Sequence, residues 1–222
     1  MVLRISYFLL MLFSLTSCFE VIEDVTFKKD GTGTFKLVVN LSQSKNEINT
    51  LMKLDSSSGY EIPKPAELNA YLDQALITLK NTEGLSGVTI KRDFNNWIFE
   101  VKTDFISTQN LEEGLIKLNN EFFGGKPFVF RNKLHYSGKA LEREMQCVDE
   151  KTRKELNKPT EKMIFAKAKY TTIYRFEGVI DKSSNKRAKI SPSKKAIMLQ
   201  CNVLNIINGK ETIQNQIKIH EP

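Results

Sequence analysis

Hydrophobic and polar positions alternate along several stretches of this chain, and this period of two predicts β-strands. The clearest pair lies at residues 21–28 and 35–41, joined by Asp30-Gly31-Thr32-Gly33. Because an Asp-Gly pair tolerates the positive φ angles of a tight turn, we predict an antiparallel hairpin here. Further alternation predicts hairpins at residues 88–93 with 97–105 and 128–131 with 134–137, and strands at 164–176, 196–203 and 213–219.

Apolar residues three or four positions apart predict helices between these strands. Ser44 and Glu47 match a capping box at the start of a short helix. Pro65 suits the first turn of a second helix. Asn110 is expected to cap a third helix, and residues 140–156 are predicted to form a surface helix.

Short turns between most of the expected strands favour antiparallel pairing. The predicted fold class is therefore α+β, with an antiparallel sheet of β-hairpins and about three to four helices packed on it. A chain of this length can bury a full core. We predict a single domain over residues 18–222, with a weak candidate sub-boundary at 124–138.

The first 17 residues have the order of parts that a secretory leader has. Arg4 provides a positive start, residues 5–13 form an apolar run too short to span a bilayer, and small residues precede Cys18. Leu15-Thr16-Ser17-Cys18 resembles the bacterial lipobox, in which the cysteine receives a diacylglycerol and the leader is removed. We therefore predict a signal peptide over residues 1–17 and lipidation at Cys18. The alternative is an ordinary secretory leader with an incidental cysteine.

Removal of this leader would leave 205 residues with 32 basic and 26 acidic side chains, a net charge of +6. No apolar run after Cys18 reaches the roughly 18 residues of a membrane-spanning helix, so we expect attachment through lipid alone. The expected location is extracytoplasmic, on the periplasmic face of the outer membrane. Nucleic acid is not an expected partner, because no aromatic residues are interleaved with the lysine clusters.

Two cysteines remain after Cys18, namely Cys147 and Cys201. Outside the cytoplasm they either form a disulfide or act as two buried thiols that pack as small hydrophobic groups. Neither lies in a C-x-x-C motif or at metal-binding spacing from a histidine, so we expect no metal and no cofactor.

The sequence contains no G-x-S-x-G, H-E-x-x-H, phosphate-loop or dinucleotide-binding motif. His135 and His220 are its only histidines and stand in no motif, so we expect both to be structural or solvated. We therefore predict that the protein is not an enzyme.

A Ser-rich segment near the C-terminus carries the densest positive charge in the chain. We interpret it either as a solvated connector or as a patch that binds an anionic surface, since each lysine near such a surface contributes about 1 kcal/mol. The basic residues of this patch are Lys182, Lys186, Arg187, Lys189, Lys194 and Lys195.

Two runs near the ends of the chain resemble the LppM-type lipoprotein domain. The first is IEDVTF at residues 22–27, followed by DGTG at 30–33 directly after the lipobox. The second is YRFEGV at residues 174–179, followed by Ser184-Asn185. The family typically has proline-glycine where this chain has Glu177-Gly178, and residues 44–140 do not align. The resemblance implies an antiparallel α+β domain, anchored by lipid outside the cytoplasmic membrane, with lipid-like molecules as candidate ligands.

Three functional hypotheses follow from the sequence. The first is a non-catalytic envelope lipoprotein whose domain binds an envelope protein or a lipid-like ligand. The second narrows this to a lipid-binding or lipid-handling module with an apolar cavity between sheet and helices. The third, a hydrolase, requires polar groups that converge in such a cavity.

Overall fold

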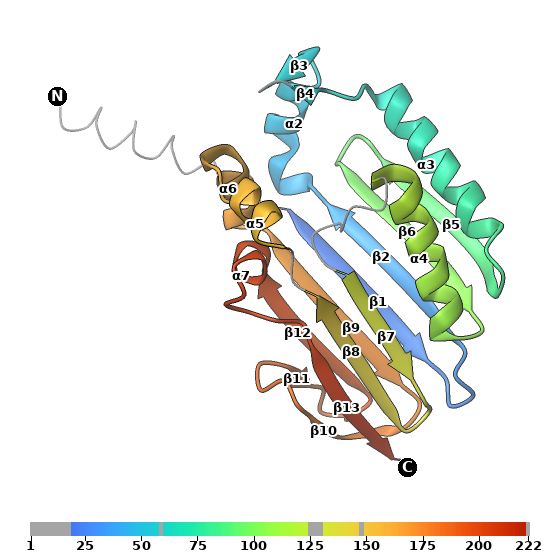
Figure 1. The fold of residues 1–222 in the computed structure, drawn as a ribbon. Helices are drawn as coiled ribbons and strands as arrows, with labels where there is room; N and C mark the ends of the chain where they lie inside the picture. The colour runs from blue at the N-terminus through green and yellow to red at the C-terminus, as the bar shows by residue number, and fades with distance from the viewer. Residues whose placement is uncertain (1–18, 58–59, 124–130, 147–148, 221–222) are drawn as a thin grey trace.

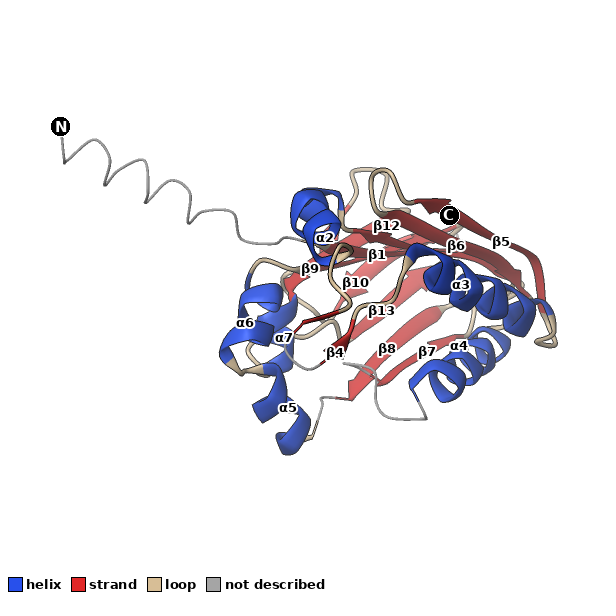
Figure 2. Cartoon of the chain, turned by 90° about the horizontal axis from the view of Figure 1, so that it is seen from above, coloured by secondary structure: helices blue, strands red, loops and turns tan. Residues whose placement is uncertain are grey.

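Two β-sheets packed face to face form the centre of the computed structural model (Figure 1, Figure 2), which describes residues 19–57, 60–123, 131–146 and 149–220. The larger sheet has seven strands. Their spatial order is β11 (Lys189–Ile190), β12 (Ala196–Asn202), β9 (Lys169–Phe176), β1 (Glu20–Phe27), β2 (Gly33–Asn40), β6 (Ile98–Phe105) and β5 (Leu85–Asp93). The strand that follows the predicted lipidation site is therefore at the centre of this sheet.

The smaller sheet has four strands and covers part of one face of the larger one. Their order is β10 (Val179–Ser183), β13 (Asn215–His220), β8 (Ala140–Gln146) and β7 (Arg131–Tyr136). Two helices lie beside it and cover β5 and β6, namely α3 (Pro65–Lys80) and α4 (Thr108–Phe123). One face of the larger sheet is thus shared between a second sheet and a helix pair.

The remaining short elements gather at the end of the larger sheet where β1 begins (Figure 1). They are the 3-10 turn η1 (Ser42–Ser44), α2 (Lys45–Leu51), β3 (Ser56–Ser57), β4 (Tyr60–Glu61), α5 (Glu150–Leu156), α6 (Pro159–Ala166) and α7 (Val203–Ile207). None of the helices in the described ranges is both long enough and apolar enough to cross a membrane.

This architecture confirms the predicted α+β class, with a sheet-rich core and packed helices. The expectation of purely antiparallel pairing is wrong for one pair, because β1 and β9 run parallel, with Glu20 beside Lys169 and Phe27 beside Phe176. Turn lengths predict only how strands adjacent in the sequence pair. Nothing local indicates a contact between segments so far apart in the chain.

The first predicted hairpin is confirmed as β1 and β2, which pair from Glu20 with Asn40 to Phe27 with Gly33. Gly31 has a φ angle of +89°, a conformation that costs glycine little and other residues more. The Asp30 carboxylate accepts a hydrogen bond from the Thr32 backbone N–H at 2.9 Å and closes the turn.

The second predicted hairpin is confirmed as β5 and β6. Its left-handed residue is Trp97, with a φ angle of 55°, and not Asn95 or Asn96. The Trp97 side chain is buried, and its Nε1 donates to Asn49 Oδ1 at 2.9 Å. Burial of this large ring offsets the strain of the turn.

Three predicted helices are confirmed, and α3 begins at Pro65 as expected, but the capping of the other two differs from the prediction. Ser44 makes no capping hydrogen bond to α2, because it already belongs to the preceding 3-10 turn. The third helix, α4, begins at Thr108, and the Ser107 hydroxyl accepts from the Asn110 backbone N–H at 3.3 Å. Asn110 therefore lies inside the helix.

The prediction of a helix over residues 140–156 is wrong for its first half. Residues Ala140–Gln146 form strand β8, which pairs with β7, so the predicted hairpin of 128–131 with 134–137 is also wrong. Residues 128–130 lie outside the described ranges. The inward-facing positions of β8 are Leu141, Arg143 and Met145, and the charged residue among them conceals the alternation.

The predicted strand at 164–176 also begins later than expected. Residues Pro159–Ala166 form α6, with Pro159 in its first turn, and β9 starts only at Lys169. The last two predicted strands are confirmed as β12 and β13. Helix α7 is not predicted by the sequence patterns.

The core between the sheets consists of two clusters of buried side chains. One lies around Phe27 and combines residues of both sheets, such as Tyr174 and Leu141. The other lies nearer the end where β1 begins, around Ala168, Cys201 and α7. Strands from before and after residues 124–138 contribute to the first cluster.

Candidate functional site

A buried carboxylate–guanidinium pair with two tyrosines lies between the two sheets. Arg143 Nη2 on β8 donates to Glu23 Oε2 on β1 at 2.7 Å. The Tyr170 hydroxyl donates to Glu23 Oε2 at 2.7 Å, and the Tyr174 hydroxyl donates to Oε1 at 2.9 Å. Glu23 and Arg143 are only 4% and 5% exposed. We call Glu23, Arg143, Tyr170 and Tyr174 the buried network.

The pairing of strands places these four side chains together. Glu23 occupies an inward position of β1, two residues before the buried Val25. The parallel neighbour β9 places Tyr170 and Tyr174 on the same face of the sheet as Glu23. They lie two residues before and two residues after the position beside Glu23. Arg143 faces them from the second sheet, so the ion pair links the two layers.

Burial raises the pKa of both tyrosine hydroxyls well above the ordinary value, and the nearby Glu23 carboxylate acts in the same direction. Burial opposes the charge of Arg143, but the attraction of Glu23 and the two tyrosines keeps its pKa above the usual value. At neutral pH the network therefore contains a guanidinium cation and two neutral phenols that donate hydrogen bonds.

One donor of this network is not satisfied. Among the residues that the structure describes, Arg143 Nε has no hydrogen-bond partner although it is fully buried. An unsatisfied buried donor costs about 1–3 kcal/mol, so the pair is not optimised for stability. Because all four side chains are buried, we assign the network a positioning role between the sheets and no catalytic role.

Apolar side chains pack around this network, and aromatic rings are prominent near Phe27. The Phe27 ring stacks on Phe176 at a centroid distance of 5.4 Å and lies 4.7 Å from Tyr136. Between α4 and the sheet the packing is equally close, since a methyl group at Gly114 would lie 2.8 Å from Leu85 Cδ1. The core is closely packed at these positions, and a lipid-binding cavity stays a hypothesis.

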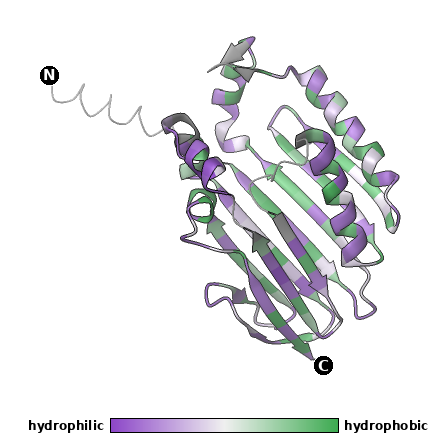
Figure 3. Ribbon diagram, in the orientation of Figure 1, coloured by the Kyte–Doolittle hydropathy of each residue, from purple (hydrophilic) through white to green (hydrophobic). Residues whose placement is uncertain are grey.

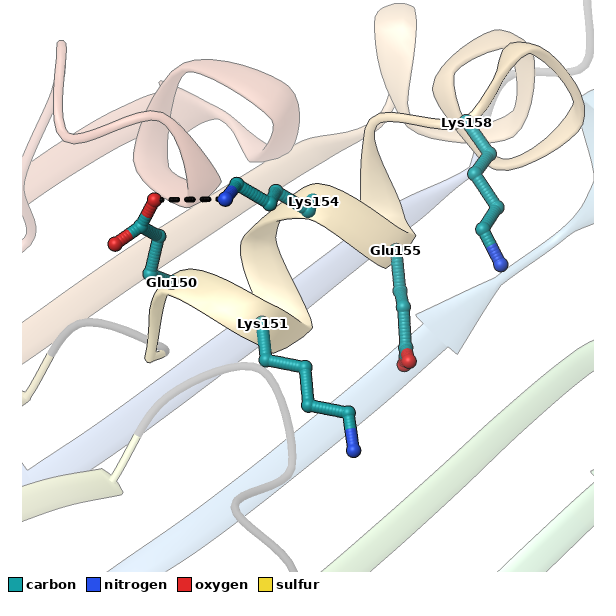
Figure 4. A pocket seen from close by; sticks show the side chains of 5 residues that line it. All are labelled: Glu150, Lys151, Lys154, Glu155 and Lys158. Carbon is teal, nitrogen blue, oxygen red and sulfur yellow. Dashed lines mark ion pairs between the residues drawn. The ribbon is translucent and has the colours of Figure 1, made fainter.

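Two surface hollows are lined by charged and polar residues. One, of about 560 Å³, lies along α5 and is lined by Glu150, Lys151, Lys154, Glu155 and Lys158 (Figure 4). The other, of about 570 Å³, lies against the smaller sheet and is lined by residues 142–144, 184–187, 212 and 214–216. Charged and amide side chains in open hollows suit a polar surface partner better than an acyl chain.

The predicted lipidation site Cys18 and the cysteine Cys147 lie outside the described residues, so lipidation and the disulfide both stay predictions. Cys201 is buried, and its thiol donates to the Thr212 carbonyl at 3.7 Å. Burial raises the pKa of the Cys201 thiol to about 11. This thiol is therefore protonated and unreactive at neutral pH.

The six residues of the predicted basic patch are spread over β10, β11, the segment between them and the turn between β11 and β12. Arg187 is paired with Glu211 at 2.8 Å. The Lys194 carbonyl accepts from the Ile180 N–H at 2.8 Å, and the Lys195 carbonyl accepts from the Phe176 N–H at 2.9 Å. The segment is thus held by hydrogen bonds, in contrast to the unpacked connector expected from its composition. Binding of an anionic surface by this patch stays a prediction.

The two histidines lie at the surface of the fold. His135 and His220 are both exposed at the outer face of the smaller sheet. Within the described ranges, no group of three or more His, Cys, Asp or Glu side chains is arranged to hold a metal ion. The buried network is the feature that sequence patterns missed. Its one signal was a glutamate at an inward position of an otherwise apolar strand face.

No family model and no curated protein matches this sequence. The fold is similar to the NMR structure of the folded domain of Mycobacterium tuberculosis LppM, with a TM-score of 0.47 and 11% sequence identity. The similarity covers 92% of this chain and 91% of that domain. At this level, it assigns neither a ligand nor a site residue to this chain.

Proposed function

We propose that the protein is a membrane-anchored, extracytoplasmic lipoprotein whose folded domain binds a partner at its surface and is not catalytic. The observation that carries this proposal is the lipobox-like segment ending at Cys18, directly before the first residue of the folded domain. The Phe19 carbonyl already accepts a hydrogen bond from the Lys169 N–H at 2.9 Å, and β1 begins at Glu20.

The position of β1 gives this anchor a structural consequence. The strand lies between β9 and β2 in the middle of the larger sheet, so a lipid on Cys18 would be attached to the core without a linker. Two or three acyl chains make such an attachment effectively permanent, because each buried methylene contributes about 0.8 kcal/mol.

The filled core and the polar hollows favour binding at the surface over storage of a ligand inside. We therefore favour an envelope protein as the partner over a lipid-like ligand in a cavity. Acidic residues after a lipidated cysteine can act as sorting signals, but Glu20 accepts from Thr171 at 2.9 Å and Asp24 pairs with Arg175 at 3.2 Å. These contacts account for both carboxylates through their role in folding. The outer-membrane location that we propose therefore does not rest on them.

Fractionation of cells that produce the wild-type protein or Cys18→Ala tests the proposal. The wild type should be found in the outer-membrane fraction and should resist extraction by high salt and alkali. The Cys18→Ala variant should accumulate as an uncleaved precursor or as a soluble form. Identical fractionation and identical mass of the two proteins would contradict lipidation.

A further inference from the structure

Helix α6 lies directly beside the residue that follows Cys18. The Phe19 ring packs edge to face on Phe165 of α6, with a centroid distance of 6.0 Å. Consecutive Cα atoms are about 3.8 Å apart, so a lipid attached to residue 18 would start within one residue of this contact. Helices α5 and α6 both lie at this end of the sheet (Figure 1).

These two helices and their flanks carry a concentrated positive charge. Residues 149–169 contain seven lysines and arginines and four acidic residues, a net charge of +3. Lys154 is paired with Glu150 at 3.0 Å. Among the side chains that the structure describes, the exposed Lys151, Lys158 and Lys162 have no carboxylate within ion-pair distance, and Lys151 and Lys158 extend toward the same side (Figure 4).

One apolar side chain of α6 is also exposed. Ile164 on α6 is 42% exposed, two residues after Lys162 and three before Lys167. The residues of α5 are mostly hydrophilic (Figure 3). Because residues two apart lie on nearly opposite sides of a helix, Ile164 does not share the face of Lys162.

The more basic C-terminal segment has a less suitable position. Lys195 is hydrogen-bonded to Phe176, which pairs with Phe27 at the far end of β1. Seven residue steps along a strand separate that level from Glu20 by about 23 Å. Exposed charges are screened over about 8 Å at physiological ionic strength, so Lys194 and Lys195 would contribute little to a surface at the Glu20 end.

We propose that Lys151, Lys158 and Lys162 form a membrane-contact surface for the anionic headgroups of the leaflet that holds the anchor. This inference rests on the proposed lipidation of Cys18, because the anchor determines which end of the domain faces the bilayer. The contact would fix the orientation of the domain and leave the far end of the sheets available to a partner. We call these three residues the membrane-contact surface.

Hydrogen exchange of the lipidated protein in vesicles tests this surface. The protein is purified from membranes and reconstituted into vesicles of phosphatidylcholine alone or of phosphatidylcholine with phosphatidylglycerol. Each exposed lysine near an anionic surface strengthens contact about fivefold. We therefore expect amides of residues 150–166 to exchange at least about threefold more slowly on the anionic vesicles, and high salt to remove this difference.

Two triple variants with the same change of charge serve as the matched comparison. Lys151→Gln/Lys158→Gln/Lys162→Gln should abolish the slower exchange, whereas Lys182→Gln/Lys194→Gln/Lys195→Gln at the far end should retain it. All six side chains are exposed, and unchanged unfolding midpoints would show that both variants fold.

The outcomes separate this inference from the proposed function. Failure of the wild type to float with neutral vesicles would overturn lipidation and, with it, the membrane-contact surface. A protein that floats with neutral vesicles but shows equal exchange in both lipids would overturn the membrane-contact surface alone. Slower exchange that is lost only in the far-end variant would assign anionic binding to the C-terminal lysines.

Discussion

The two ends of the space between the sheets are filled by different chemistry. At the far end, Phe27, Tyr136 and Phe176 pack as aromatic rings with centroids 4.7–5.9 Å apart. Nearer the predicted anchor, the same strands contribute the buried network around the Glu23–Arg143 pair. Glu23 and Phe27 are only four positions apart along β1.

This difference indicates what each end specifies. Aromatic packing is driven by removal of apolar surface from water and tolerates small shifts between the sheets. A buried ion pair does not tolerate such shifts, because a charge that loses its partner is left in a low-dielectric interior. We therefore infer that apolar packing provides most of the stability and that the buried network fixes how the two sheets align nearer the predicted anchor.

The largest effect is expected when one partner of the buried ion pair is removed. Glu23→Ala leaves Arg143 charged, buried and unpaired, and it also leaves two tyrosine hydroxyls without their acceptor. We expect a loss of about 3–5 kcal/mol in the free energy of unfolding, measured by urea denaturation of the folded domain. The matched control is Asp24→Ala on the opposite face of β1, where Asp24 pairs with the partly exposed Arg175 and Lys36. Such surface pairs contribute at most about 1 kcal/mol each.

A double variant sharpens this prediction. Replacing both charges, as in Glu23→Leu/Arg143→Leu, removes the desolvation penalty together with the pair, so it should be less destabilising than Glu23→Ala alone. Equal losses for the single and double variants would contradict a role based on charge matching.

A smaller effect is expected at the aromatic end. Phe27→Leu keeps an apolar side chain but leaves part of the ring volume empty, so we expect a loss of about 2 kcal/mol by the same denaturation measurement. The matched variant Phe99→Leu changes a ring that is only partly buried and should lose less. A loss at Phe27 as large as that of Glu23→Ala would remove the contrast between the two ends.

Alkaline pH should lower the free energy of unfolding through the two tyrosines of the buried network. Burial raises the pKa of Tyr170 and Tyr174, so the unfolded chain releases these protons near pH 10 while the folded chain retains them. Their stabilisation is therefore complete below about pH 10 and is lost as pH rises toward the folded-state pKa, by about 1.4 kcal/mol per pH unit for each tyrosine. Tyr174→Phe should make the alkaline part of the stability curve shallower; a curve parallel to that of the wild type would contradict this interpretation.

The smallest effect is expected in the turn at the far end. Gly31 has a φ angle of +89°, and a side chain there would meet no atom within 4 Å. Gly31→Val should therefore cost only the backbone strain, about 1 kcal/mol, visible as a lower denaturation midpoint. An unchanged midpoint would show that the turn relaxes into another type.

The sequence predicted those parts of the fold in which local chemistry determines the structure. The Asp30-Gly31 turn and the alternation around it defined β1 and β2, because turn and strand preferences agree there. Strand β8 was missed because Arg143 occupies an inward position. Helix α6, which begins at Pro159, was missed because the alternation that predicts β9 extends back to residue 164. The parallel pairing of β1 with β9 and the buried network depend on contacts between distant segments, which no local pattern reveals.

The candidate surfaces followed the same rule. Cys18 was identified from a local motif, and its lipidation still awaits a test. The C-terminal lysines were selected by charge density alone, whereas the position of α6 beside Phe19 depends on the fold. Whether a basic cluster lies near the predicted anchor therefore depends on the fold and not on charge density along the sequence.

The mass of the amino-terminal peptide from membrane-extracted protein tests the central claim of an anchored lipoprotein most directly. We predict that the peptide lacks residues 1–17, begins at Cys18 and carries the added mass of a diacylglycerol, with or without a further acyl chain on its amino group. A peptide that begins at Met1, or one with an unmodified Cys18 thiol, would contradict the account.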